Sequence, residues 1–140
     1  MYLPPADWPS PLSLVLADSE LDCAERHGDE AVLTLASARV HWPSLTQRAP
    51  QQGWLWPLRL QFTGIQAWEA VALLPGRIAS AHLQCDGQDL TLTLPGRMDE
   101  RREGRLTLTL EGSRGGHLRL QAAALRIVLD GAQLRDSLAC

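Results

Sequence analysis

A five-residue pattern that alternates leucine and threonine occurs twice in this chain, at residues 90–94 and 106–110. Successive side chains of a β-strand point to opposite faces, so this alternation places every leucine on one face and every threonine on the other. A helix would instead spread the leucines around its axis. The pattern therefore predicts half-buried antiparallel strands, and it constrains the fold more than any other feature of the sequence.

The size and composition of the chain predict one globular domain. The sequence has 140 residues, of which 45% are hydrophobic, and a chain of this length can form a core without disulfide bonds or metal ions. No stretch approaches the run of about 18 apolar residues that indicates a membrane-spanning helix. The N-terminal residues lack the basic and apolar regions of a secretory signal. We therefore expect a cytoplasmic protein that makes no contact with a membrane.

All 13 basic residues are arginines, and the chain contains neither lysine nor asparagine. This bias is typical of a GC-rich genome and indicates a bacterial source. The abundance of arginine is therefore weak evidence for phosphate binding. The formal charge of −3 also argues against a nucleic-acid partner, because nucleic acids bind basic surfaces.

The distribution of prolines and of apolar alternation divides the chain in two. Residues 1–11 hold four prolines and predict an extended leader, whereas residues 12–140 predict a single antiparallel β domain. About eight strands at spacings near ten residues are typical of a β-sandwich or a small barrel. The expected strands cover residues 12–17, 20–26, 31–42, 54–63, 77–85, 90–94, 106–110 and 117–129.

Several positions predict irregularities in these strands. Near Ser37 and across Ala122–Ala124, the apolar residues shift between odd-numbered and even-numbered positions of the strand. These changes of parity predict two β-bulges. In the strand at 54–63, Pro57 favours an edge position or a late start to the strand pairing. Residues 65–74 fit either a short helix or an extended edge segment, so one short helix remains an alternative.

Acidic residues are concentrated near the N-terminus. Residues 1–40 carry seven acidic residues and two arginines, whereas the rest of the chain carries nine acidic residues and eleven arginines. Asp18, Glu20 and Asp22 alternate along a predicted strand, so their carboxylates share a face, and Glu25 lies nearby. We expect this acidic strand to bind a protein partner, in particular a basic one. A solvated face and a divalent cation site are the alternatives.

Three tryptophans lie on either side of a polar segment at residues 43–53. Trp42 precedes this segment, and Trp54 and Trp56 follow it. Tryptophan is enriched at binding hot spots and in ligand pockets, so we expect these side chains to contact a partner or a ligand. The alternative is a core role, because Trp54 and Trp56 are in phase with Leu58 and with the apolar positions beyond it.

The chain carries no catalytic or cofactor signature. It has no metal-binding histidine motif, no nucleophile elbow and no phosphate-binding loop, and its three cysteines lie far apart. We expect no cofactor and no metal ion. Our hypothesis is a non-catalytic protein-binding module, for example an immunity or antitoxin protein that occludes a basic toxin. The alternatives are a small-molecule-binding barrel or sandwich, an enzyme with an unrecognised site, and an assembly subunit.

Overall fold

The computed structural model of the chain describes residues 2–3, 12–43, 51–94, 101–129 and 133–136. Of the predicted leader, residues 1–11, the structure describes Tyr2 and Leu3, and the rest lies outside these ranges. The described residues form strands and no helix, so the predicted all-β class is confirmed. In chain order the strands are β1 (Tyr2–Leu3), β2 (Leu12–His27), β3 (Glu30–Trp42), β4 (Gln51–Trp56), β5 (Leu58–Thr63), β6 (Ala67–Val71), β7 (Gly76–Cys85), β8 (Gln88–Asp89), β9 (Thr93–Leu94), β10 (Arg101–Gly112), β11 (His117–Val128) and β12 (Gln133–Asp136).

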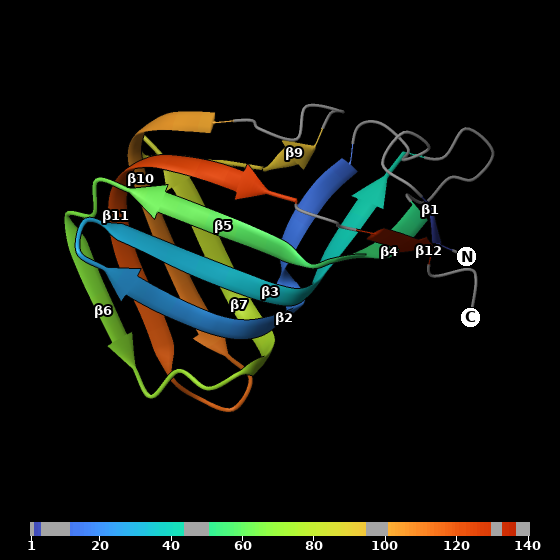
Figure 1. Cartoon of the computed structure of the whole chain (residues 1–140), viewed down its shortest axis with the longest axis horizontal. Helices are drawn as coiled ribbons and strands as arrows, with labels where there is room; N and C mark the ends of the chain where they lie inside the picture. Colours follow the sequence, from blue (N-terminus) through green and yellow to red (C-terminus); the bar gives the residue numbers. More distant parts are fainter. Residues whose placement is uncertain (1, 4–11, 44–50, 95–100, 130–132, 137–140) are drawn as a thin grey trace.

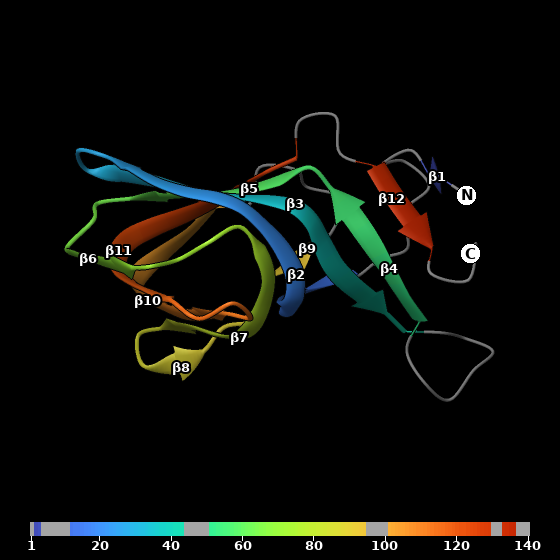
Figure 2. The same cartoon turned by 90° about the horizontal axis from the view of Figure 1, so that it is seen from below.

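A central antiparallel path of strands turns back on itself. The path runs β3, β5, β11, β10, β7 and β2, and β2 then pairs with β3. Figure 1 shows β2, β3 and β5 crossing over β7 and β10. This partly closed ring agrees with the predicted sandwich or small barrel. Strands β4, β12 and β1 extend the sheet beyond the ring, at the right-hand end of Figure 2.

The second leucine–threonine repeat forms the central part of β10, as its alternation predicts. Its leucines, Leu106, Leu108 and Leu110, are fully buried in the core of the ring. In the first repeat, only Thr93–Leu94 forms a strand, β9, which pairs with the start of β2. Two identical segments therefore differ in structure, because strand formation depends on the neighbours that a segment meets.

The first two predicted strands form one long strand, β2, with a large bulge in its middle. Val15 pairs with Arg39 and Glu20 pairs with Ser37, so four residues of β2 lie opposite a single residue of β3. Within this bulge Asp18 has a φ of 70°, a conformation that aspartate adopts more readily than most residues. The bulge bends β2, which therefore continues in a new direction instead of ending.

Ser19 is a buried polar side chain that holds this bulge together. Its hydroxyl donates a hydrogen bond to the carbonyl of Val15 at 2.7 Å and accepts one from the N–H of Arg39 at 2.9 Å. The side chain is 0% exposed. These two bonds satisfy backbone groups at the place where the bulge interrupts the ladder between β2 and β3.

Replacing Ser19 by alanine is expected to lower the free energy of unfolding by about 2–3 kcal/mol, because the carbonyl of Val15 and the amide of Arg39 would both lose their part-buried hydrogen-bond partner. Ser80→Ala, at an exposed position of β7, is the control and should change stability by less than about 0.5 kcal/mol. Urea unfolding followed by tryptophan fluorescence measures both variants. Equal midpoints would contradict this role of Ser19.

Both predicted changes of parity are confirmed, and each lies where a strand exchanges one neighbour for another. Strand β3 pairs with β5 as far as Leu35 and with β4 from Ala38, and both residues are fully buried. Strand β11 pairs with β6 as far as Gln121 and with β5 from Ala124. The buried positions of β11 then continue at Leu125. These bends let single strands belong to both halves of the ring.

The single long strand predicted from Trp54 onward is wrong. It consists of β4 and β5, which meet at Pro57, and the peptide bond from Trp56 to Pro57 is cis. Leu55 and Leu58 are both fully buried, so the residues that face the core are odd-numbered before the proline and even-numbered after it. Because Trp54 and Trp56 neighbour Leu55 in the strand, their side chains point to the opposite face.

The helix alternative for residues 65–74 is also wrong, because Ala67–Val71 is the extended strand β6. It pairs antiparallel with β11, which places Trp68 beside Leu120 and Ala70 beside Leu118. The backbone groups of β11 offer this segment hydrogen-bond partners that a helix would not use.

Candidate partner-binding surface

The structure places Asp18 apart from the other predicted acidic residues. Its carboxylate accepts a hydrogen bond from Nη1 of Arg39 at 2.8 Å and lies 3.5 Å from Nε of Arg77. Arg39 also donates to the side-chain oxygen of Gln52 from Nε and Nη2. Two guanidinium groups surround this one carboxylate, so Asp18 adds no net negative charge to the surface. It ties β2 to β3 and β7 instead.

Glu20, Asp22 and Glu25 occupy exposed positions along β2 as it approaches its turn into β3. The carboxylate of Glu25 lies 3.3 Å from Nε2 of His27 on the same strand. The turn adds two further exposed carboxylates. We call the whole set the acidic hairpin: Glu20, Asp22, Glu25, Asp29 and Glu30. Figures 1 and 2 show that the tip of the β2–β3 hairpin reaches the left-hand end of the molecule.

The three predicted tryptophans differ in burial. Trp42 is 6% exposed and belongs to the core, and its indole N–H donates to the side-chain oxygen of Gln51 at 3.2 Å. Trp54 and Trp56 are half-buried on β4. Trp42, which was expected to contact a partner, therefore belongs to the core. The core alternative for Trp54 and Trp56 is wrong, because both lie on the face of β4 opposite the fully buried Leu55. None of the three belongs to either of the hollows described below.

A mostly apolar hollow of about 360 Å³ lies between β2 and the connection from β6 to β7. Asp22 of the acidic hairpin is the charged residue in its lining. The apolar lining includes Leu21, Cys23 and Ala24 from β2 and Leu73, Leu74 and Pro75 from the connection. The hollow therefore joins an apolar surface directly to the acidic hairpin.

Two large apolar side chains are exposed where β6 ends and its connection to β7 begins, and one of them, Leu74, lines this hollow. Val71, at the end of β6, is 48% exposed, and Leu74, in the connection, is 51% exposed. Sequence reasoning missed this surface, because it treated residues 65–74 only as a question of helix or strand. The signal was present, since Ala70–Pro75 is an uninterrupted apolar run that ends in a turn instead of continuing into a core strand.

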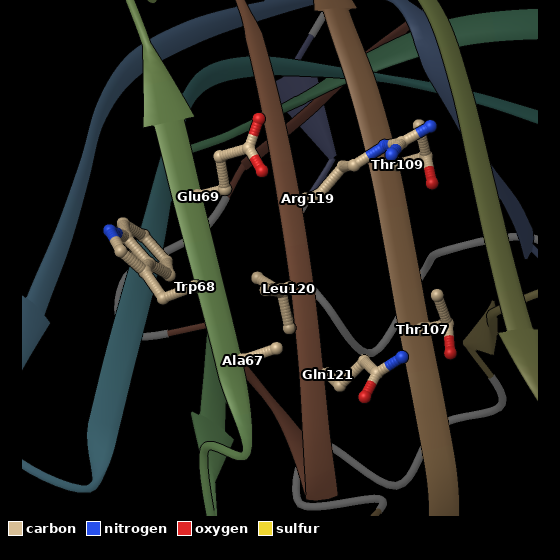
Figure 3. Close-up of a pocket in the computed structure, with 8 residues that line it drawn as sticks. All are labelled: Ala67, Trp68, Glu69, Thr107, Thr109, Arg119, Leu120 and Gln121. Carbon is tan, nitrogen blue, oxygen red and sulfur yellow. The ribbon is translucent and has the colours of Figure 1, made fainter.

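A second hollow, of about 450 Å³, lies over the outer faces of β6, β11 and β10. Figure 3 shows the side chain of Arg119 extending from β11 toward Thr109 on β10. Glu69, on β6, accepts a hydrogen bond from Nε2 of His117 at 2.9 Å. This bond holds the pKa of Glu69 below its ordinary value. Partial desolvation raises the pKa, whereas the charges of His117 and Arg119 lower it further.

The described residues contain no cluster of three or more histidine, cysteine, aspartate or glutamate side chains that could hold a metal ion. In the same part of the chain, no helix has the length and apolar character needed to span a membrane. The chain matches no protein-family model, and it resembles none of the curated proteins and none of the solved structures with which it was compared.

Proposed function

We propose that this protein is a non-catalytic protein-binding module that recognises a basic partner through the acidic hairpin and the apolar hollow beside it. The observation that carries the proposal is the junction of the two features. An exposed apolar patch rimmed by charged residues is typical of a protein-binding surface. Here Asp22 belongs to both features, and Leu74, which lines the hollow, is about half exposed.

The charge of the hairpin supports a basic partner. Five exposed carboxylates lie on it, and the nearby Arg26 donates from Nε to the carbonyl of Gly28 within the same turn. A concentration of negative charge speeds the approach of a cationic protein and disfavours acidic ones. An immunity or antitoxin protein that covers a basic toxin is one form that such a module takes, and the negative charge of the hairpin supports this form.

The proposal is tested with two double variants that remove the same number of charges. Asp22→Asn/Glu25→Gln alters the acidic hairpin, and Asp89→Asn/Glu111→Gln alters exposed carboxylates on β8 and β10. Wild-type protein captures its partner from a lysate of the source organism, and mass spectrometry identifies that partner. Association rates are then measured between the purified proteins at several salt concentrations.

We expect the hairpin variant to associate about tenfold more slowly at low salt, with a flatter salt dependence, because electrostatic steering can contribute one to three orders of magnitude to a rate. The control variant should behave like the wild type. An acidic partner, or equal rates and salt slopes for all three proteins, would overturn the proposal.

The second hollow favours one alternative, a binding site for a small polar molecule. Its lining combines Glu69, Arg119, Thr109 and Gln121, which offer both hydrogen-bond donors and acceptors. A thermal-shift screen with sugars, nucleotides and amino acids tests it. A ligand whose stabilising effect disappears in Arg119→Gln would support this function, and no shift with any compound would count against it.

A further inference from the structure

Strand β6 presents a free edge to the surface. One edge of β6 pairs with β11 over five residues, from Ala67 opposite Gln121 to Val71 opposite His117. Within the described ranges, no strand pairs with the other edge. The backbone N–H and C=O groups of a free edge remain available to a further strand.

A second free edge lies across the apolar hollow from β6. Strand β7 pairs with β2 only at Glu20 and Leu21, and the following residues of β2 pair with β3 alone among the described strands. The hollow is lined by this part of β2 on one side and by Ala70 and residues 72–75 on the other. The wall of the ring is therefore interrupted here, and the gap contains apolar side chains.

The edge of β6 lacks the features that usually protect edge strands. Such strands commonly carry several charges, an internal proline or a bulge that prevents pairing with another chain. Strand β6 carries one charged residue, Glu69, and no proline. Val71 and Leu74 remain about half exposed just where the strand ends. An unprotected edge beside an apolar hollow is typical of sites where a partner adds a strand.

We infer that an extended basic segment of a partner protein docks along the free edge of β6 and places apolar side chains in the hollow beside β2. This inference rests on the proposed function and specifies how the partner is held. Main-chain hydrogen bonds to β6 would supply affinity, and alternate side chains of the segment would supply specificity.

Charge identifies the occupant as a basic segment and not as a second copy of this chain. Glu69 stands at the centre of β6, where its exposed carboxylate accepts a hydrogen bond from His117. Two copies that pair antiparallel about a two-fold axis through this residue would place Glu69 opposite Glu69, which is unfavourable. An arginine or lysine of another protein would instead meet Glu69 and, across the hollow, Asp22.

The test uses a defined probe, a fluorescein-labelled peptide with the sequence Leu-Arg-Val-Arg-Val-Arg-Leu, and the full chain. A second peptide carries N-methyl groups on alternate backbone amides, and a third has glutamate in place of arginine. Fluorescence anisotropy measures binding. We expect the basic peptide to bind and the N-methylated one to bind about tenfold or more weakly, since each lost hydrogen bond weakens binding severalfold. The acidic peptide should not bind.

Two variants locate the site on the protein. Leu74→Arg places a bulky charge at the hollow and should abolish peptide binding, whereas Gln88→Arg adds the same charge at an exposed position of β8 and should leave it unchanged. Leu74 is about half exposed, so this substitution is compatible with folding. Hydrogen exchange followed by NMR should show slower exchange at amides of β6 when the peptide is bound.

The outcomes separate this inference from the proposed function. Strand addition would be overturned if the peptide does not bind, or if its binding is unaffected by Leu74→Arg and by N-methylation. The proposed function would still stand if the captured partner associates in a way that depends on the charges of the acidic hairpin. The proposed function would be overturned if peptide binding requires Leu74 but the captured partner associates equally fast with the wild type and the hairpin variant. A stable dimer in analytical ultracentrifugation that Leu74→Arg dissociates would replace the partner segment with a second copy.

Discussion

A Gly116→Ala variant is expected to unfold at a much lower denaturant concentration than a Gly87→Ala variant. Both glycines have a φ of +82°, so both substitutions carry the same penalty, about 1–2 kcal/mol, for an alanine in the left-handed region. They differ in the space around the new methyl group. At Gly87 no atom lies within 4 Å, whereas at Gly116 the methyl carbon would lie 2.5 Å from the carbonyl carbon of Ala72 and 2.8 Å from the nitrogen of Leu73.

The neighbours of Gly116 are backbone atoms of the β6–β7 connection, which cannot rotate out of the way as a flexible side chain can. We expect the clash to cost about 2–3 kcal/mol beyond the penalty shared with Gly87→Ala. Urea unfolding of the two variants measures this difference directly. Similar stabilities would show that the β10–β11 turn and the connection do not pack as closely as the structure indicates.

The same substitution should disturb the candidate site, because Ala72 and Leu73 line the apolar hollow. Where Gly116→Ala remains folded, for example at low temperature, it should bind the basic peptide more weakly than Gly87→Ala does. Equal affinities would mean that the hollow does not depend on the position of this connection.

A Leu108→Ala variant is expected to lose about 3–4 kcal/mol of stability, because a fully buried leucine leaves a cavity when it is shortened. Leu108 is 0% exposed on β10, between Leu83 on β7 and Leu120 on β11. Three strands of the ring therefore contribute to its surroundings. The loss is a large part of the total stability of a domain of this size.

Leu74→Ala is the matched control for this core substitution, because the same atoms are removed at a position that is 51% exposed. Its stability should change by less than about 0.5 kcal/mol, whereas its affinity for the partner should fall. Thermal and urea unfolding measure stability, and the binding assays above measure affinity. A Leu108→Ala variant as stable as Leu74→Ala would contradict the placement of Leu108 in the core.

The distribution of acidic residues shows how far the candidate site could be predicted. Alternation placed Glu20 and Asp22 on an exposed face of one strand, and the structure agrees. It could not show that Asp18 lies in a bulge, because the bulge depends on the register with β3, which local sequence does not specify. Nor could it show that Arg39 and Arg77, distant in the chain, surround that carboxylate.

The apolar hollow was beyond sequence reasoning for a related reason. Its two sides come from residues 21–24 and from Ala70 and residues 72–75, and only the closure of the ring brings them together. The free edge of β6 is likewise a property of strand order, since the same five residues would be covered in another topology. An apolar run was visible in the sequence, but neither its exposure nor its neighbours were.

The sequence by itself determined the all-β class, the strands with clear alternation and the two bends where the apolar parity changes, because side-chain alternation is a local property of an extended backbone. Only the tertiary structure decided which of two identical leucine–threonine segments became a full strand, which face of β4 carries its tryptophans and which edge stayed free. These outcomes depend on strand partners distant in the chain, and pairing between distant segments is set by the packing of the whole ring.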